Sequence, residues 1–378
     1  MNSQPLAIDL FCGVGGMSLG FKQAGFRVVG AFDNEEKHVR AYKKNFPHVA
    51  ANQADLRKST GKELLDSLDL DDDVIDIVFG GPPCQGFSLG GIRSLDDERN
   101  LLIYEFARLV QEIQPRYFVM ENVQGLMIGH AHQALNEFIN LVRCAGYCVV
   151  DDIRVLNAAN YAVPQRRKRI FVLGYRSDVT PPTYPEPTPI IKANGHKYFP
   201  TVKDAISDLP KVDSCEYLFD CDGFNGKLGK PYHYARLMRG EIRESSDTLP
   251  LRNRNGYPLT GCLRTRHTPK TAHRFYQTQP GKSEPISRYY RLSLDGLAPT
   301  IRAGTGKDHG KHTSPRPIHP EAPRCITVRE AARLHSYPDW FQFDETRWHA
   351  FRQIGNSVPP RLARCVAAEI ERICINDR

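Results

Sequence analysis

The sequence predicts an α/β fold: a mostly parallel sheet with helices between successive strands, and a second, smaller, loop-rich domain. Short apolar runs alternate with amphipathic segments over residues 1–175, which is the pattern of βαβ units. After Gly174 the chain becomes rich in proline and then irregular, with many glycines and arginines. A regular helical pattern returns near residue 327. We therefore expect three segments, 1–175, 176–323 and 324–378.

Each element follows from a local pattern. Six apolar runs predict strands at 6–11, 27–32, 74–79, 117–121, 148–156 and 169–173, and residues 49–55 occupy the place of a further short strand. Apolar residues at spacings of three and four predict helices at 17–24, 36–45, 101–113 and 133–145. Thr327 and Glu330 form a capping box for a helix over 328–335, and a last helix covers 361–374.

The positive charge is concentrated in one region. The chain of 378 residues carries 51 Lys or Arg and 43 Asp or Glu, and residues 176–323 hold 23 of the bases and 15 of the acids. Within 236–316 the numbers are 16 and six. Aromatic residues are interleaved with these arginines, so the segment favours a nucleic-acid partner through phosphate contacts and stacking. A basic surface that serves only solubility stays open.

The cysteines and the amino terminus bear on location. Ten cysteines occur without CxxC pairs, which indicates reduced thiols rather than a disulfide framework. No pair has a convincing partner pair, so we expect no metal. The first five residues lack a secretory leader, and no run of about 18 apolar residues occurs. We therefore expect a cytoplasmic protein with no membrane contact.

A glycine-rich turn follows the first strand. Gly13, Gly15 and Gly16 allow a tight turn and let a ligand approach a helix amino terminus. Ser18 stands where a nicotinamide dinucleotide fingerprint has its third glycine, which disfavours a dehydrogenase. On its own this pattern also fits a bare turn before a helix.

Two acids indicate that the turn binds a nucleoside. Asp33 ends the second strand about 20 residues beyond the glycines, where a carboxylate can accept hydrogen bonds from ribose hydroxyls. Asp55 ends the next short segment and can bind an exocyclic amine. Because the GxxxxGK[ST] phosphate loop is missing, a nucleoside without a polyphosphate is the better interpretation.

Cys84 is the candidate nucleophile. It lies in GGPPCQGFS at 80–88, beyond the strand at 74–79, between two prolines and a flexible glycine. In parallel sheets the chemistry lies beyond the carboxyl ends of the strands. An arbitrary cytosolic cysteine is usually a small buried hydrophobe, but the flanking prolines and glycine argue against that here.

Glu121 and a run of cations complete the predicted reacting centre. Glu121 closes the strand at 117–121, so it emerges at the same rim as Cys84 and can serve as the acid beside a nucleophile. The segment 165–169, QRRKR, precedes the strand at 170–173 and places Arg167 and Arg169 on alternate positions. They favour carbonyl or anion recognition and the thiolate of Cys84, although a solvated basic edge is the alternative.

At this point the chain resembles the DNA (cytosine-5)-methyltransferases, an AdoMet-dependent bacterial family with a Rossmann-like methyltransferase fold, also found in restriction-modification systems. The matching segments occur in the family's order: DLFCGVGG at 9–16, Asp33, Asp55, GGPPCQGFS at 80–88, ENV at 121–123, QRRKR at 165–169, REAARLHSYP at 329–338 and GNSVPP at 355–360. About residues 176–300 lie outside the match and correspond to the target-recognition region.

The resemblance implies a covalent mechanism on a flipped base. The Cys84 thiolate would add to cytosine C6, so that C5 can take the methyl group of S-adenosyl-L-methionine (AdoMet), while Glu121 binds or protonates N3. Arg167 and Arg169 would hold the base carbonyl and the Cys84 loop. The cytosine would have to rotate out of the duplex. The base that removes the C5 proton is not assigned.

The family correspondence also implies further site residues. The cofactor-binding set is Phe11, Gly13, Gly15, Gly16, Asp33, Asp55, Pro83, Leu102, Asn356 and Val358. The DNA-contacting or base-flipping loop set is Gln85, Gly86, Ser88 and Gln165. Because two cofactor positions lie near the carboxyl terminus, the segment 324–378 would return to the catalytic domain. We expect a monomer acting on double-stranded DNA, functionally paired with a restriction endonuclease.

The chain departs from the family pattern at the ribose site. Members often carry a longer Glu where this chain has Asp33, and an apolar residue where it has Asn34, so Glu35 is a further candidate for ribose. The Thr-Leu or Thr-Val pair of the recognition region is ambiguous, with Thr248-Leu249 one candidate.

Two other functions stay open on the sequence. The first is a tRNA cytosine-5 methyltransferase, which the long basic insert disfavours. The second is a non-catalytic DNA-binding protein, which an intact set of Cys84, Glu121 and Arg167 disfavours. The recognition sequence cannot be deduced from one chain.

Overall fold

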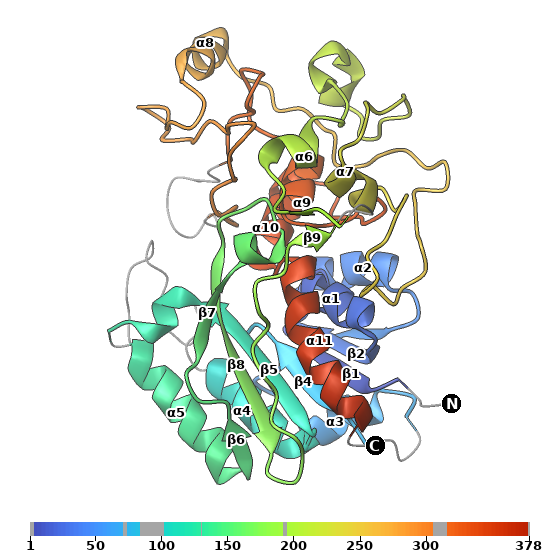
Figure 1. Ribbon diagram of the computed structural model, residues 1–378, viewed down its shortest axis with the longest axis vertical. Coiled ribbons are helices and arrows are strands. Elements are labelled where there is room, and N and C mark those ends of the chain that lie inside the picture. The colour runs from blue at the N-terminus through green and yellow to red at the C-terminus, as the bar shows by residue number, and fades with distance from the viewer. Residues whose placement is uncertain are drawn as a thin grey trace. The chain divides into compact units, whose positions relative to one another are not determined.

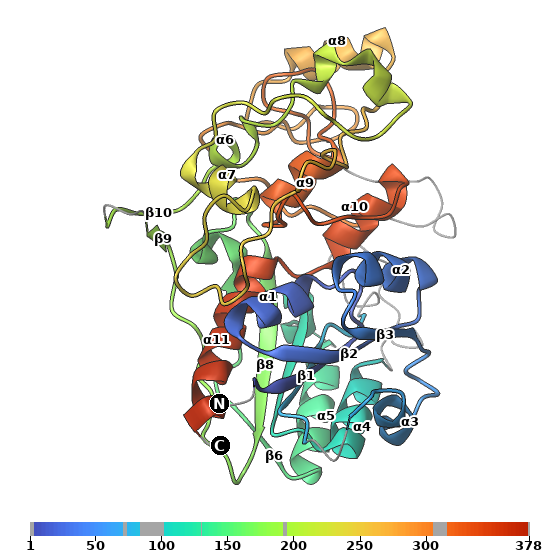
Figure 2. The ribbon, with the colours of Figure 1, turned by 90° about the vertical axis from the view of Figure 1, so that its right-hand side faces the viewer.

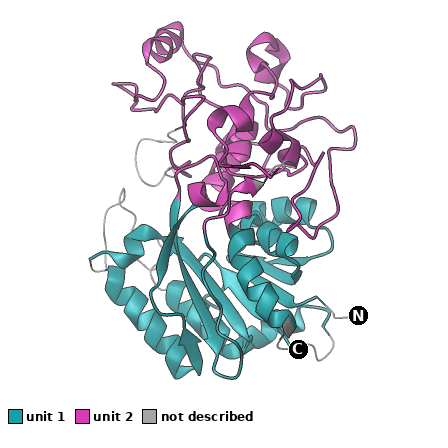
Figure 3. Cartoon of the chain, in the orientation of Figure 1, with its two compact units in different colours: residues 1–157, 168–186, 363–378 teal, residues 158–167, 187–362 magenta. Residues whose placement is uncertain are grey.

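The computed structural model describes residues 4–70, 74–83, 102–129, 131–191, 195–304 and 316–376. The chain forms two compact units (Figure 3). Unit 1 comprises Met1–Asn157, Lys168–Glu186 and Ala363–Arg378, and unit 2 comprises Ala158–Arg167 and Pro187–Leu362. This division is purely structural, and the functional boundaries after residues 175 and 323 stay predictions.

Unit 1 is built on a mixed, mostly parallel sheet (Figure 1). Its described strands run in the order β3-β2-β1-β4-β5-β8-β6, and β7 pairs with β8. Neighbours among β1 to β5 are parallel, whereas β8 is antiparallel to β5, β6 and β7. The predicted α/β class with a mostly parallel sheet is therefore confirmed. The strands are β1 (Leu6–Leu10), β2 (Arg27–Asp33), β3 (Ala50–Gln53), β4 (Ile77–Gly80), β5 (Tyr117–Val123), β6 (Tyr147–Val149), β7 (Arg154–Asn157) and β8 (Lys168–Arg176).

Helices cover both faces of this sheet, with α4 and α5 on one face and α11 on the other (Figure 2). The apolar stripe of α4 packs into the main core: Phe106, Leu109 and Val110 are buried there with Val78 and Phe118 of the sheet. The helices of unit 1 are α1 (Gly16–Ala24), α2 (Glu36–Asn45), α3 (Gly61–Asp66), α4 (Leu102–Ile113), α5 (Ala131–Cys144) and most of α11 (Pro360–Asn376).

The single strand predicted over 148–156 is wrong. Two strands, β6 and β7, pair with opposite ends of the long strand β8, and the residues between them leave the ladder. Asp151 and Asp152 form the interruption, and Asp152 has a φ of 61° that a strand cannot accommodate. Asp is one of the few residues that adopt this conformation readily, because its short polar side chain can bond locally.

Unit 2 has little regular secondary structure, and its α-helices are short. They are α6 (Val202–Ile206), α7 (His233–Met238), α8 (Pro269–Gln277), α9 (Val328–Leu334) and α10 (Arg347–Asn356), beside the two-residue strands β9 (Ile190–Ile191) and β10 (Lys197–Tyr198). Short 3₁₀ turns occur at Gln124–Met127 in unit 1 and at Ala158–Tyr161, Val212–Ser214 and Glu216–Phe219 in unit 2. The predicted capping box is present: the Thr327 hydroxyl accepts from the Glu330 N–H, and the Thr327 N–H donates to Glu330 Oε2.

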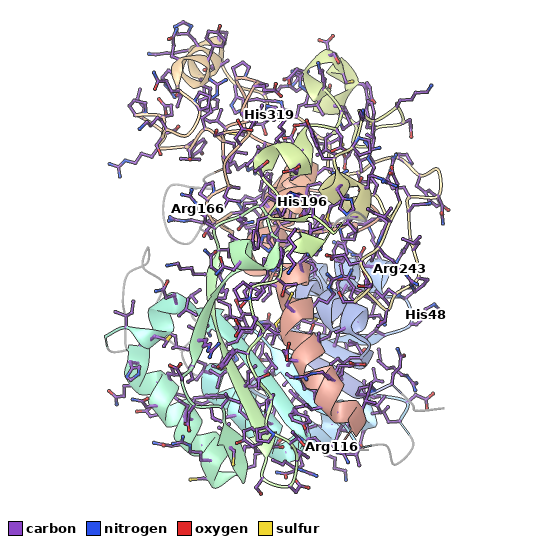
Figure 4. The ribbon with its side chains drawn as sticks, viewed as in Figure 1. His48, Arg116, Arg166, His196, Arg243 and His319 are labelled. Atoms are coloured by element: carbon purple, nitrogen blue, oxygen red, sulfur yellow. The ribbon has the colours of Figure 1, made fainter. Side chains whose placement is uncertain are left out.

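Buried ion pairs replace part of the apolar core in unit 2. The guanidinium of Arg333, which is fully buried, lies 2.6 Å from Asp339 and 3.2 Å from Asp208. Arg324 donates two hydrogen bonds to the buried Glu330 at 2.8 and 2.9 Å. His319, labelled in Figure 4, lies 3.6 Å from the same carboxylate.

Among the described residues, none of the helices combines the length and apolarity that crossing a bilayer needs.

The Glu330 pair predicts a pH dependence of stability. Burial alone would raise the pKa of Glu330, but Arg324, His319 and the Thr327 N–H outweigh it and lower the pKa from 4.5 to about 2. Because the folded pKa lies below the ordinary value, the ionised carboxylate stabilises the fold fully above pH 4.5 and this contribution is lost as the pH falls toward 2. The melting temperature of Glu330→Gln should therefore fall less steeply between pH 4.5 and 2 than that of the wild type, measured by circular dichroism. Parallel slopes would contradict the assignment.

Candidate active site

The glycine turn and Asp33 form one hydrogen-bonded unit. Gly13 and Gly15 have φ values of 53° and 90°, which favour glycine. The Gly13 N–H donates to Asp33 Oδ2 at 2.9 Å, so the end of β2 holds the turn that follows β1. Asp33 Oδ1 accepts the Glu35 N–H at 2.9 Å and lies 3.1 Å from His38 Nδ1. Asp33 is thus a fixed, buried carboxylate beside the turn.

A buried chain of hydrogen bonds links β1, which precedes this turn, to the helices α1 and α2. The Ser18 hydroxyl donates to Asp9 Oδ2 at 2.6 Å, and the Tyr42 hydroxyl donates to Ser18 at 2.6 Å. Burial raises the pKa of Asp9 and of Tyr42. Sequence reasoning noticed Ser18 only as the residue that breaks a dinucleotide fingerprint. The structure gives the physical reason: a glycine there would leave the buried Asp9 without this donor.

The rings of Tyr42 and Phe46 explain why residue 15 is glycine. A Cβ at Gly15 would lie 2.5 Å from the Phe46 ring and 2.8 Å from the Tyr42 ring. A Cβ at Gly13, by contrast, would meet no atom of the described chain within 4 Å. The turn is therefore packed on its Gly15 side and open beside Gly13.

The end of β4 is tied to the end of β5. A Cβ at Gly80 would lie 2.1 Å from the carbonyl oxygen of Leu10, so only glycine fits beside β1. The Asn122 amide donates to the carbonyl oxygen of Pro82 at 3.0 Å. These contacts orient the chain that leads to position 84. Asn122 was part of the matched ENV segment, but its role was not predicted.

Glu121 is held in place by Arg169. Arg169 Nε lies 2.8 Å from Glu121 Oε1, and the two side chains are 13% and 8% exposed. The strands β5 and β8 are paired here, with Val123 opposite Arg169. Burial lowers the pKa of Arg169, while the charge of Glu121 opposes that shift. This pairing of Glu121 with Arg169 was not predicted from the sequence, which assigned Arg169 to the base carbonyl and the Cys84 loop.

Arg167 and Gln165 are interior residues of unit 2. The guanidinium of Arg167 is fully buried and donates to the carbonyl oxygens of Ile301, Gly355 and Ser357 at 2.8 to 3.1 Å. Gln165 is also fully buried, and its amide bonds the carbonyl of Leu334, the ring of His335 and the N–H of Ile301.

The other predicted cofactor-binding residues lie on several different elements. Phe11 is half-buried with a φ of 59°, Gly16 begins α1, and Leu102 begins α4. Both oxygens of Asp55 accept from Arg57 at 2.9 Å, and this hydrogen bonding lowers the pKa of Asp55. Asn356 is exposed and Val358 is buried, both in unit 2.

The nucleophile itself is not described. Cys84, Gln85, Gly86 and Ser88 lie outside the described residues, and Pro83, which is exposed, precedes this gap. The structure therefore shows the end of β4, which precedes Cys84 in the chain, and the end of β5, which carries Glu121.

Comparison with known proteins identifies the family. The family model for C-5 cytosine-specific DNA methylase matches residues 6–372. The chain belongs to this family. Among curated relatives of this methylase, the type II methyltransferase M.XorII of Xanthomonas oryzae pv. oryzae is 50% identical over 368 residues, spanning 97% of this chain and 85% of its own. M1.HphI of Haemophilus parahaemolyticus is 32% identical over 375 residues, spanning 98% and 87%.

Solved structures agree with this assignment. The crystal structure of a DNA modification methyltransferase encoded within an E. coli prophage is 34% identical, with a TM-score of 0.80 over 98% of this methylase and 99% of that chain. The Dnmt2 methyltransferase of S. pombe is 16% identical with a TM-score of 0.54 and shares the fold alone. This methylase is a DNA (cytosine-5)-methyltransferase.

The close approach of Gly81 to Glu121 yields a prediction. A Cβ at residue 81 would lie 2.9 Å from Glu121 Oε2, so the carboxylate would have to move. We expect Gly81→Ala to lower kcat about 10- to 100-fold, because Glu121 is the acid predicted for the reaction and small misplacements of such a group are costly. Methyl transfer from radiolabelled AdoMet measures the effect. Gly296→Ala is the control, since its Cβ would meet nothing closer than 3.5 Å. A stable Gly81→Ala with wild-type kcat would contradict the placement of Glu121.

Proposed function

We propose that this methylase modifies cytosine at C5 in one specific duplex sequence, through a covalent adduct of Cys84 and with AdoMet as the methyl donor. One observation carries the proposal: a buried carboxylate, Glu121, is fixed beside Gly81, three residues before Cys84. The type II relatives support a role in restriction-modification, paired with an endonuclease. A cytoplasmic monomer is part of the same proposal.

The residues around the glycine turn fit AdoMet. The open space beside Gly13 would accept a ligand against the main chain, and Asp33, together with Glu35, would serve the ribose hydroxyls. The rest of the binding set would be Phe11, Gly15, Gly16, Asp55, Pro83, Leu102, Asn356 and Val358. Arg57 already occupies Asp55, so an exocyclic amine would share or replace that contact. When bound, AdoMet supplies an electrophilic methyl group on a sulfonium.

The chemistry then depends on two side chains. The Cys84 thiolate forms a bond to C6 of the flipped cytosine, which moves electron density to C5. Once it has taken up a proton, the Glu121 carboxyl donates a hydrogen bond or that proton to N3 and thereby stabilises the adduct. After C5 has gained the methyl group, the C5 proton leaves, the sulfur–C6 bond breaks and the thiolate departs. Arg169 keeps the Glu121 carboxyl in position during these steps.

Arg167 and Gln165 would act by positioning. Their polar atoms bond the interior of unit 2, so they would support the segments 301 and 355–357 rather than touch the base directly. Gln85, Gly86 and Ser88 would form the loop around the extruded cytosine. Flipping costs a few kcal/mol, which contacts in the pocket would offset.

Sequence reading would come from the basic region of unit 2. Described side chains that face solvent there include Lys270, His273, Gln277 and Arg288. Lys and Arg would contact phosphates, whereas Arg, Asn and Gln can read bases in the major groove.

The test is methylation of plasmid DNA in cells that express the protein. Bisulfite sequencing should find methylcytosine at one recurrent sequence, and Cys84→Ala should abolish it because no adduct can form. Glu121→Gln should lower the rate at least about 100-fold, within the range general acid catalysis contributes. Methylcytosine absent from every DNA context would refute the proposal, and modification of tRNA instead would establish the RNA alternative.

A further inference from the structure

His38 contacts the carboxylate that is proposed to bind ribose. It lies in the first turn of α2, five residues after Asp33, and its Nδ1 is 3.1 Å from Asp33 Oδ1. The side chains of His38 and Asp33 are 20% and 10% exposed, so the contact is largely shielded from water. Because an ionised carboxylate only accepts hydrogen bonds, Nδ1 must carry the proton at this contact.

The hydrogen bonds of Asp33 leave little capacity for a ligand. A carboxylate has about four acceptor positions. Oδ1 receives the Glu35 N–H and His38 Nδ1, and Oδ2 receives the Gly13 N–H. Among the described residues these are the donors to the Asp33 carboxylate, so one acceptor position remains, on Oδ2. That oxygen is the one bonded to the glycine turn.

The His38 contact limits how the Asp33 carboxylate can rotate. Without the His38 contact each oxygen of Asp33 would keep a single main-chain donor, the Glu35 N–H on Oδ1 and the Gly13 N–H on Oδ2. The His38 contact adds a side-chain donor on the oxygen opposite the turn. It therefore makes rotation of the carboxylate about its terminal torsion more costly and keeps the free acceptor position on Oδ2, the oxygen bonded to Gly13.

We propose that His38 is a positioning residue for the cofactor: it holds Asp33 so that Oδ2 accepts a hydrogen bond from one ribose hydroxyl of AdoMet. The inference rests on the proposed function and goes beyond it, because it assigns a role to His38 and limits Asp33 to a single ribose hydroxyl. The second hydroxyl must find another partner.

Binding of S-adenosyl-L-homocysteine (AdoHcy) and its 2′-deoxy and 3′-deoxy forms, measured by calorimetry, tests this. The wild type should bind one deoxy form about tenfold more weakly than AdoHcy and tolerate the other, as the loss of one hydrogen bond implies. His38→Ala should bind AdoHcy about tenfold more weakly and should no longer distinguish the deoxy form. His38→Asn, whose amide can donate from a similar position, should restore both. Lys43→Ala, an exposed change on the same helix, is the control and should match the wild type.

The results distinguish a failure of the His38 role from a failure of the proposed cofactor. Wild-type affinity and discrimination retained in a folded His38→Ala, or a His38→Asn that behaves like His38→Ala, would overturn the role of His38. An equal penalty for both deoxy forms in the wild type would overturn the single-hydroxyl assignment. A wild type that binds no AdoHcy would instead show that the proposed cofactor is wrong, and this inference would fall with it.

Discussion

The buried ion pair between Glu121 and Arg169 is the contact on which the geometry of the site depends. It joins the ends of β5 and β8, the strand at which the parallel sheet reverses direction. Removing one partner of a buried pair leaves an uncompensated charge and typically costs about 3–5 kcal/mol, so both side chains are constrained together. Their position in turn excludes a side chain at Gly81 and places the carboxyl beside the chain that leads to Cys84. The steric limit at Gly81 and the ion pair of Glu121 with Arg169 therefore both constrain the start of the segment that follows β4.

In unit 2 the main chain is irregular, so many of its carbonyl groups lack the hydrogen-bond partners that helices and sheets supply. Buried arginines supply the donors: Arg291 bonds the carbonyls at the end of α8, and Arg329 bonds those of Thr260, Pro338 and Phe341. Arginine is suited to this because its planar group carries five donors and stays charged. The positive composition of the region therefore has two causes. Part of the charge holds the unit together from inside, and only the exposed part is available to DNA.

Most of unit 1 could be predicted because its signals are local. Apolar periodicity gave β1, β2, β5 and the main helices, and motif spacing brought Glu121 and Asp33 to the correct strand ends. The missed features depend on contacts between distant residues or on single torsions. Asp152 divides a predicted strand through its φ alone, and neither the Tyr42–Ser18–Asp9 chain nor the Asn122 bond to Pro82 has a periodic signature. Ser18 in a glycine's place was the one visible clue. Unit 2 offered few such signals, since buried arginines look like surface residues in a sequence.

The central claim is that a sulfur–carbon bond to the pyrimidine makes C5 nucleophilic, and trapping that bond tests it most directly. The duplex would carry 5-fluorocytosine at the methylated position, with AdoMet supplied, because fluorine cannot leave as the proton does. The account predicts a protein–DNA complex of equal stoichiometry that survives denaturing electrophoresis, with the DNA attached to the peptide that contains Cys84. If ordinary duplexes are methylated while the fluorinated duplex never becomes attached to the protein, the covalent mechanism is contradicted.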